Sequence, residues 1–271
     1  MPRLTGLRSA FRVVIDAAVT VTLAPVCAAC ESPLDTPSAS PVCQRCWSSI
    51  RPLAHPLCEL CGDSLPSWRV ISASLGRCAR CRRTVPSTDA GRSASDYSGA
   101  MRHIIHAFKY GKRRSLAQPL SGLMRAAAGP VLDDADCVVP VPLHLLRRFQ
   151  RGFNQAADLA AFVGPPVVHA LWRTEPTRPQ TGLTAGARQR NVRRAFRLSP
   201  LLTESTLNTR IRGRVVVLVD DVRTTGATLD ACARTLKAAG AREVRSLTAA
   251  RATLISKDKD TPDVKQRHQA A

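Results

Sequence analysis

Along the second half of the chain, short runs of apolar residues alternate with segments in which apolar residues recur every three or four positions. Short runs rich in β-branched residues are typical of buried strands, and the longer repeat is typical of helices that bury one face. The pattern predicts strands at 137–141, 167–172, 214–219 and 244–250, and helices at 154–163 and 229–239. Strands that alternate with helices indicate an α/β fold with a doubly wound parallel sheet flanked by helices.

Three further segments lie outside this alternation. Residues 97–128 contain two helical repeats separated at Tyr110-Gly111, so we expect two helices there. Residues 1–26 carry one helical repeat, which predicts an amphipathic N-terminal helix. Residues 253–271 are polar and aperiodic, which predicts a disordered tail.

The sequence contains no candidate transmembrane helix, because no run of about 18 apolar residues is present. We expect the N-terminal helix to pack against the protein, and attachment to the inner face of a membrane is the alternative. The basic and apolar residues at the start are followed by no small-residue cleavage site, which favours a cytoplasmic location.

Residues 27–95 lack sustained periodicity and contain eight of the ten cysteines, arranged as four Cys-x-x-Cys pairs. Such a segment cannot build an apolar core of its own, so it needs another source of stability. Twelve residues separate the first two pairs and sixteen separate the last two, which suits Cys₄ zinc ribbons or knuckles. The sequence predicts one or two structural Zn²⁺ ions held by Cys27, Cys30, Cys43, Cys46, Cys58, Cys61, Cys78 and Cys81.

The spacing alone leaves the pairing of these cysteines open. We favour sequential pairing, in which the first Cys-x-x-Cys joins the second and the third joins the fourth, and a cross-braced arrangement is the alternative. Redox or disulfide pairs are a further alternative, which a reducing compartment disfavours. Cys137 and Cys232 stand in apolar contexts and are predicted to be inert core thiols.

The segment VVVLVDDVRTTGAT, residues 215–228, joins an apolar run, two adjacent carboxylates and a short loop that opens a helical pattern. A buried parallel strand would deliver the carboxylates to the carboxyl edge of a sheet. There, backbone N–H groups, hydroxyls and the partial positive charge of a helix start can hold a phosphate, and paired carboxylates suit vicinal hydroxyls. We expect a ribose and phosphate site made by Asp220, Asp221, Thr224, Thr225, Gly226, Ala227 and Thr228.

The formal net charge of +20 indicates a further class of binding partner. So basic a chain is expected to attract polyanions such as nucleic acid, nucleotides or anionic lipid. Residues 140–200 contain ten arginines against two acids, and arginine can bind phosphate oxygens with two parallel hydrogen bonds. The alternative is that most of these arginines are solvated surface charges.

The carboxylate pair and its loop closely resemble the phosphoribosyl pyrophosphate signature of type I phosphoribosyltransferases. Together with VVPVPLHLLRRFQRGFNQAADLA, RTEPTRPQTGLTAGARQRNVRRAF, YSGAMRHIIHAFKYGKRR and the cysteine pairs, they make the chain resemble the ComF family. That family is known for proteins of bacterial DNA uptake and for gluconate-associated relatives. The resemblance covers about residues 23–252 and implies a type I phosphoribosyltransferase-like sheet behind an N-terminal Cys₄ zinc region.

The resemblance also implies roles for particular residues. Asp220 and Asp221 would hold the ribose hydroxyls of phosphoribosyl pyrophosphate, bound with Mg²⁺, and the loop after them would hold its 5′-phosphate. A mobile loop near 178–191 would close over the pyrophosphate, with Arg178 and Arg188 as candidates for catalysis. No general base is evident, because Thr224 stands where purine-salvage enzymes have a carboxylate. The pyrophosphate-binding turn would be Val141, Pro142, Leu143 and His144, flanked by Arg147, Arg148 and Arg151.

We therefore expect four parts: a helix at 1–26, a double zinc-ribbon or knuckle region at 27–95, a phosphoribosyltransferase domain at 96–252, and a tail at 253–271. The expected activity is pentosyl transfer, a glycosyltransferase reaction, from phosphoribosyl pyrophosphate to an unspecified acceptor. The alternative is a non-catalytic, zinc-containing factor that binds single-stranded DNA or the DNA-uptake machinery during competence. A homodimer is one open possibility for its assembly.

Overall fold

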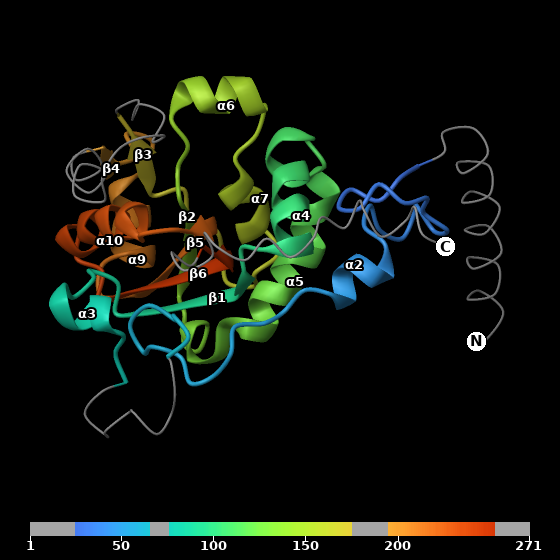
Figure 1. Ribbon diagram of the computed structural model, residues 1–271. Helices are drawn as coiled ribbons and strands as arrows, with labels where there is room; N and C mark the ends of the chain where they lie inside the picture. Colours follow the sequence, from blue (N-terminus) through green and yellow to red (C-terminus); the bar gives the residue numbers. More distant parts are fainter. Residues whose placement is uncertain (1–24, 66–75, 175–194, 253–271) are drawn as a thin grey trace, which may run out of the picture. The chain divides into compact units, whose positions relative to one another are not determined.

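The computed structural model describes residues 25–65, 76–174 and 195–252 (Figure 1). All but the last two residues of the helix expected at 1–26, and the whole tail expected at 253–271, lie outside these described residues. None of the described helices is long and apolar enough to cross a membrane.

The chain divides into two compact units. The first contains the described residues of 25–50 and 98–116, with the first four cysteines of the cysteine-rich region. The second contains the described residues of 51–97 and 117–252, with the next four cysteines and the main sheet. The second unit therefore joins half of the cysteine-rich region to the α/β core.

A sheet of four parallel strands forms the centre of the second unit. Its spatial order is β1 (Ala90–Asp96), β6 (Glu243–Arg251), β5 (Val215–Arg223) and β2 (Cys137–Pro140). The first five residues of β5 are fully buried, because helices cover both faces of the sheet. Continuous apolar runs are typical of strands in this position, so the expected α/β fold is confirmed.

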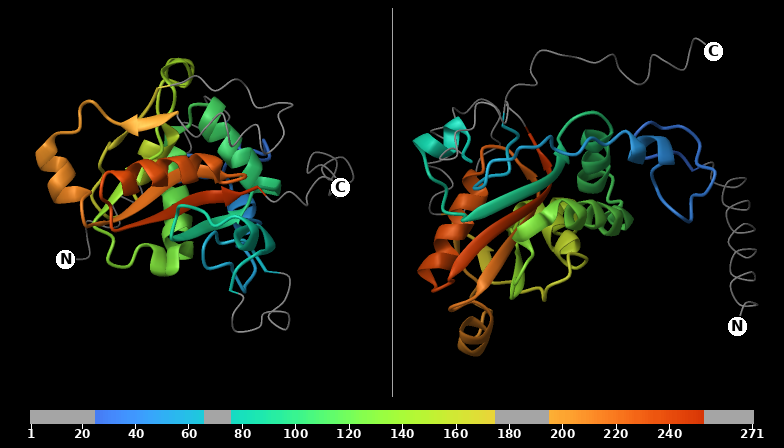
Figure 2. Two further views of the ribbon diagram at one scale, coloured as in Figure 1. Left: turned by 90° about the vertical axis from the view of Figure 1, so that its left-hand side faces the viewer. Right: turned by 90° about the horizontal axis from the view of Figure 1, so that it is seen from below.

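Helices pack on both faces of this sheet (Figure 2). α5 (Ala117–Ala128) and α7 (Gln155–Ala160) lie on one face and contact each other, while α10 (Ala227–Ala238) lies on the opposite face. Val216 and Leu218 of β5 belong to the apolar cluster on the α10 side. That cluster also contains both cysteines predicted to be core thiols, and each is fully buried. Burial raises the pKa of the Cys137 thiol to about 11.

The strand predicted at 167–172 is confirmed only in part. Val167 makes a single parallel bridge, to Val138 of β2. The last two residues of the run begin β3 (Leu171–Arg173), which pairs antiparallel with β4 (Phe196–Leu198) in a separate two-stranded sheet and not with the main sheet. Val168 and Ala170, between the bridge and β3, belong to the buried cluster on the α10 side.

β1 and several short elements were not predicted from the sequence. β1 carries no apolar run, and its buried positions include Ser93 and Ser95. The Ser93 hydroxyl hydrogen-bonds to the Thr248 hydroxyl of β6 at 2.7 Å, which satisfies both polar groups inside the sheet. The remaining short elements of this unit are α3 (Ala79–Arg83), η3 (Gly129–Val131), α6 (Leu145–Arg151) and α9 (Glu204–Arg210).

The first unit contains α2 (Gln44–Ser48), α4 (Gly99–Tyr110) and η2 (Arg114–Leu116). The helix break expected at Tyr110-Gly111 is confirmed, because α4 ends at Tyr110 and the next α-helix, α5, begins at Ala117. α4 buries one apolar face, which is the face that its helical repeat predicts. Those buried residues are Met101, Ile104, Ile105 and Phe108.

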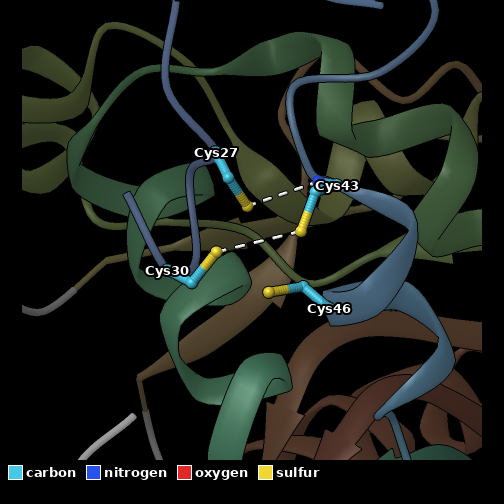
Figure 3. Close-up of side chains that lie close together, drawn as sticks. All are labelled: Cys27, Cys30, Cys43 and Cys46. Carbon is cyan, nitrogen blue, oxygen red and sulfur yellow. Dashed lines mark hydrogen bonds between the residues drawn. The ribbon is translucent and has the colours of Figure 1, made fainter. Parts of the chain in front are cut away.

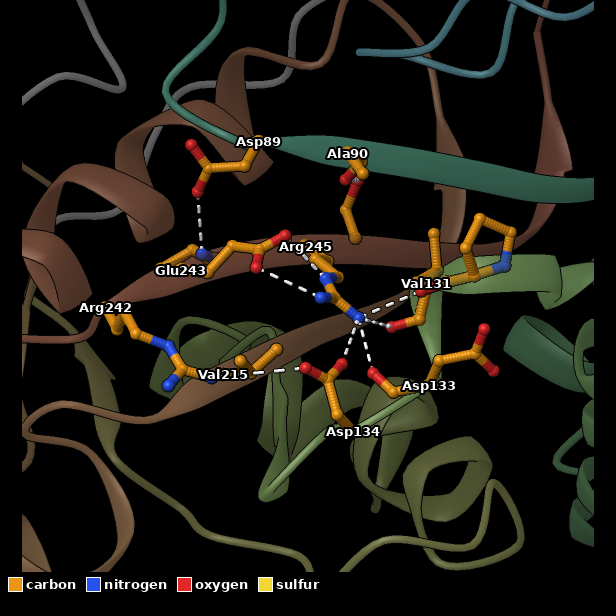
Figure 4. Close-up of polar contacts among 12 residues, drawn as sticks. Asp89, Ala90, Val131, Asp133, Asp134, Val215, Arg242, Glu243 and Arg245 are labelled. Carbon is orange, nitrogen blue, oxygen red and sulfur yellow. Dashed lines mark hydrogen bonds and ion pairs between the residues drawn. The ribbon is translucent and has the colours of Figure 1, made fainter.

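Arg245 joins the amino end of β6 to the segment between α5 and β2 (Figure 4). Its Nη1 donates to the carbonyl oxygens of Pro130 at 2.9 Å and Asp133 at 2.5 Å. Its Nε and Nη2 donate to the two carboxylate oxygens of Glu243, at 2.6 and 3.0 Å. The hydrogen bonds with Glu243 raise the pKa of the Arg245 guanidinium, and the group thus connects two segments while remaining charged.

We expect Arg245→Met to lower the free energy of unfolding by about 3 kcal/mol, because it leaves the carbonyl oxygens of Pro130 and Asp133 and the Glu243 carboxylate without their donor. Arg242→Met is the matched control, since Arg242 is exposed and reaches Asp134 only across 4.0 Å. Its effect should stay below about 1 kcal/mol. Urea denaturation followed by circular dichroism measures both, and equal losses would contradict the role given to Arg245.

Candidate functional site

Four cysteines of the first unit converge on one point (Figure 3). The backbone N–H of Cys43 donates to the sulfur of Cys27 at 3.3 Å, and the sulfurs of Cys30 and Cys43 lie 3.8 Å apart. Burial acts to raise the pKa of the Cys30 thiol, but hydrogen bonds with Ser32 outweigh it and lower the pKa to about 6. Burial instead raises the pKa of the Cys43 and Cys46 thiols, so Cys30 is the member of the group formed by Cys27, Cys30, Cys43 and Cys46 that loses its proton most readily of these three.

Four cysteines of the second unit repeat this arrangement. The N–H of Cys78 donates to the sulfur of Cys58 at 3.3 Å, and the sulfurs of Cys61 and Cys78 lie 3.6 Å apart. In both groups a short helix begins directly after the third cysteine, α2 in the first and α3 in the second. We call Cys27, Cys30, Cys43 and Cys46 the first cysteine group, and Cys58, Cys61, Cys78 and Cys81 the second.

Both cysteine groups fit a Zn²⁺ ion. Zn–S bonds of about 2.3 Å in a tetrahedron place the sulfurs about 3.8 Å apart. Within each group all four ligand atoms lie within 4.8 Å of one another. The structure therefore brings the cysteines together in the sequential pairing and not in the cross-braced one. A thiolate set of this kind supplies a structural site, closed to other ligands.

The carboxylate pair lies at the carboxyl end of β5. Asp220 is half-buried and Asp221 is buried, and the N–H of Asp221 donates to Asp220 Oδ1 at 2.9 Å. The strand continues to Arg223 before the loop begins, further than the pattern predicts. The carboxylates thus stand on a paired, rigid strand rather than in the loop itself.

The loop after β5 opens directly into α10. Gly226 is the residue before the helix and has φ +81°, a left-handed conformation that favours glycine. The N–H of Ala227 donates to Thr225 Oγ1 at 3.4 Å, and Thr224 is exposed at the start of the loop. Because α10 has twelve residues, its first N–H groups and its dipole favour an anion at this end.

The turn predicted to bind pyrophosphate follows β2, the strand beside β5. The N–H of Val141 donates to the carbonyl oxygen of Val219 at 2.9 Å, so the turn begins directly beside the carboxylate pair. His144 precedes α6, and its Nδ1 accepts from the N–H of Leu146 at 3.3 Å. The turn also contains Pro142 and Leu143, both half-buried.

The three arginines predicted to flank this turn all lie on α6, which extends from the end of β2 (Figure 1). Arg148 is exposed, and Arg147 and Arg151 are half-buried. Arg151 donates to Gln155 Oε1 at 2.9 Å, which connects α6 to the start of α7. Arg178 and Arg188, and the loop expected at 178–191, lie outside the described residues.

Sequence reasoning missed two buried arginines near these residues. Arg173, at the end of β3, lies 5.3 Å from the centre of the Phe196 ring. Burial lowers the pKa of Arg173, as does the charge of Arg147, while Asp220 acts in the opposite direction. Arg223 is the last residue of β5 and is also buried. Each of these arginines is the last residue of an apolar strand. That position in the sequence was the signal from which their burial could have been predicted.

Comparison with known protein families assigns the cysteine pairs and the carboxylate pair to two different domains. Residues 172–268 match the phosphoribosyl transferase domain, and residues 18–82 match the double zinc ribbon domain. The first of these matches includes the carboxylate pair and its loop. The second includes all eight cysteines of the two groups.

Similar proteins align over most of the chain. DNA utilization protein YhgH of Escherichia coli K12 is 32% identical over 224 residues, which cover 74% of this chain and 93% of that protein. Competence protein F of Haemophilus influenzae is 28% identical, covering 78% of this chain and 90% of that protein. Competence protein ComFC of Bacillus subtilis is 28% identical, covering 76% and 82%. This chain contains a double zinc ribbon domain followed by a phosphoribosyl transferase domain. The chain belongs to the ComF family.

Proposed function

We propose that this protein binds phosphoribosyl pyrophosphate together with Mg²⁺ at the carboxyl ends of β2 and β5. The observation that carries the proposal is the pairing of these strands, in which Pro140 lies beside Val219. Because of this register, the turn after β2 and the carboxylate pair of β5 meet at one edge of the sheet. The family and the phosphoribosyl transferase domain support the same class of ligand.

Each part of the ligand has matching groups in this proposal. Asp220 and Asp221 accept hydrogen bonds from the two ribose hydroxyls. The N–H groups and hydroxyls of the loop at 224–228 donate to the 5′-phosphate, aided by the start of α10. The turn at 141–144 and the arginines of α6 neutralise the pyrophosphate, whose oxygens suit guanidinium groups.

We further propose that the protein transfers the phosphoribosyl group to an acceptor and releases pyrophosphate. The bond between ribose C1 and the pyrophosphate oxygen breaks, a bond from C1 to the acceptor forms, and the acceptor loses a proton. The arginines of α6 would stabilise the negative charge on the departing pyrophosphate, and a bound Mg²⁺ would supply further positive charge there, so positioning and electrostatics would carry the reaction. Thr224 offers no carboxylate for proton removal, and we assign no general base to this chain.

A second candidate function is binding of single-stranded DNA. The net charge of +20 favours it, as does α6, whose exposed Phe149 lies between Arg148 and Arg151. An exposed aromatic ring among cations is an arrangement on which unpaired bases stack. The relatives named for DNA utilization and competence support the same class of partner.

The ribose site is tested by the double variant Asp220→Asn with Asp221→Asn. We expect isothermal titration with phosphoribosyl pyrophosphate and Mg²⁺ to show at least about 100-fold weaker binding, because charge-assisted hydrogen bonds to both hydroxyls are lost. Asp133→Asn with Asp134→Asn is the matched control, since both residues are exposed and precede β2 at the other end of the sheet. An unchanged titration in the first variant would reject the assignment.

Zinc content is tested on the purified chain. We expect two Zn²⁺ per molecule by elemental analysis, one for each cysteine group. Removal by a chelator should lower the melting temperature by about 10 °C or more, because the metal replaces an apolar core in the cysteine-rich region. Restoration of the melting temperature by added Zn²⁺ is the control, and a metal-free protein of equal stability would contradict a structural role.

The DNA alternative is tested by fluorescence anisotropy with a single-stranded oligonucleotide. Binding through phosphate contacts predicts that the logarithm of affinity falls linearly as the logarithm of salt concentration rises. The Asp220→Asn with Asp221→Asn variant should bind the oligonucleotide as the unmodified protein does. Absence of binding at low salt would remove this candidate.

A further inference from the structure

Three arginines gather beside the second cysteine group, all within the second unit. Arg223 and Arg251 are 4% and 3% exposed, and Arg80 is half-buried. The carboxylate of Asp63 forms ion pairs with two of them, Arg80 at 3.2 Å and Arg251. The second of these pairs includes a hydrogen bond from Arg251 Nη2 to Asp63 Oδ2 at 2.6 Å.

Asp63 cannot balance this charge alone, because one carboxylate offsets one of three guanidinium groups. Burying a cation without compensation costs several kcal/mol. A Zn²⁺ ion with four thiolates carries a charge of about −2, which matches the remaining two positive charges. The groups that act electrostatically on Arg223 include the sulfurs of Cys61 and Cys81. A metal-loaded second cysteine group would thus act as a counter-ion of these arginines.

Arg223 packs directly beneath the turn that carries Cys61. A Cβ atom added to Gly91 of β1 would lie 2.8 Å from Arg223 Nη1 and 3.2 Å from the carbonyl oxygen of Leu60. A Cβ atom added to Gly62 would lie 2.6 Å from the carbonyl oxygen of Gly91. The cysteine turn, β1 and the guanidinium therefore form successive layers in contact.

The Arg223 guanidinium also contacts the loop at 224–228. A Cβ atom added to Gly226 would lie 3.0 Å from Arg223 Nη2 and 3.1 Å from its Nε. Arg223 Nη1 also donates to the Ser246 hydroxyl of β6 at 3.2 Å, which fixes the orientation of the group. Arg223 thus occupies the space between the second cysteine group and the loop that begins α10.

We propose that the metal of the second cysteine group holds Arg223 in place beneath the loop at 224–228, so that affinity for the 5′-phosphate depends on this metal and not on that of the first group. Arg223 is a positioning residue: it supports the loop backbone at Gly226 and adds positive charge behind it. The inference rests on the proposed function, since it concerns the same phosphate site.

Paired cysteine variants test the dependence on metal. Cys81→Ser weakens the second group, and Cys46→Ser is the matched control, because each is the last cysteine of its group and is buried on a short helix. We expect isothermal titration with phosphoribosyl pyrophosphate and Mg²⁺ to show about tenfold or greater loss of affinity for Cys81→Ser. A change of less than about twofold is expected for Cys46→Ser. Similar affinities in the two variants would overturn the proposal.

Variants of Arg223 leave all the cysteines intact and test the same link without risk to the metal ligands. We expect Arg223→Met to weaken binding of ribose 5-phosphate about tenfold, while pyrophosphate, which lacks the 5′-phosphate, binds as before. Arg223→Lys keeps the charge and should recover part of the affinity. A purely structural role predicts equal losses for both ligands and no recovery.

Zinc release gives a measurement independent of the ligand. With a chelating dye present, Arg223→Met should release one of the two Zn²⁺ ions faster than the unmodified protein, because its charge partner is gone. By reciprocity, phosphoribosyl pyrophosphate should slow release of that same ion. If the unmodified protein binds two Zn²⁺ but no phosphoribosyl pyrophosphate, the proposed function fails and the ligand part of this inference fails with it. Equal release rates in Arg223→Met and the unmodified protein would overturn the link to the metal.

Discussion

The pairing of β5 between β2 and β6 determines where the carboxylate pair of the proposed ribose and phosphate site lies. β5 aligns Val219 with Pro140 on one side and Asp220 with Thr248 on the other. Successive side chains on a strand point to opposite faces, so a slip of one residue would exchange the faces of Asp220 and Asp221. The buried apolar residues of β5 prevent this slip, because they would have to leave two packed helix layers. The buried core thus fixes the register of β5, and this register determines the face of the sheet on which each carboxylate lies.

The cysteine groups solve a different problem. Seven side chains at 25–65 are buried, of which four are cysteines and three are Leu34, Val42 and Leu53, so this segment has only a small apolar core. Metal–thiolate bonds can replace an apolar core there. In the second unit we propose a second consequence of such bonds, since the thiolates would place negative charge against β5 and β6, whose last residues are Arg223 and Arg251. In that proposal the metal and the sheet stabilise each other.

The sequence predicted those parts in which local pattern and tertiary environment agree. β5, β6 and α10 follow from apolar periodicity, and the eight cysteine ligands follow from their spacing, which left open how the pairs combine into groups. β1 was missed because it is built from serine, glycine and alanine, whose burial depends on hydrogen bonds to β6 that no local pattern encodes. The strand expected at 167–172 forms only in part, because burial and strand pairing produce the same apolar run. Arg223 was missed because arginine in a sequence is normally an exposed residue.

Arg223 also explains why half of the cysteine-rich region folds with the sheet. An apolar residue at the end of β5 would be buried without an electrostatic cost, whereas a guanidinium needs a counter-ion at that depth. In our proposal Asp63 and the metal-loaded second cysteine group supply it, and both precede β1 in the chain. The cysteine-rich region expected at 27–95 thus contributes the edge strand β1 and, in this proposal, the negative charge that a buried arginine needs. A cut at the boundary expected after residue 95 would remove both, since the second cysteine group belongs to the same compact unit as the loop at 224–228.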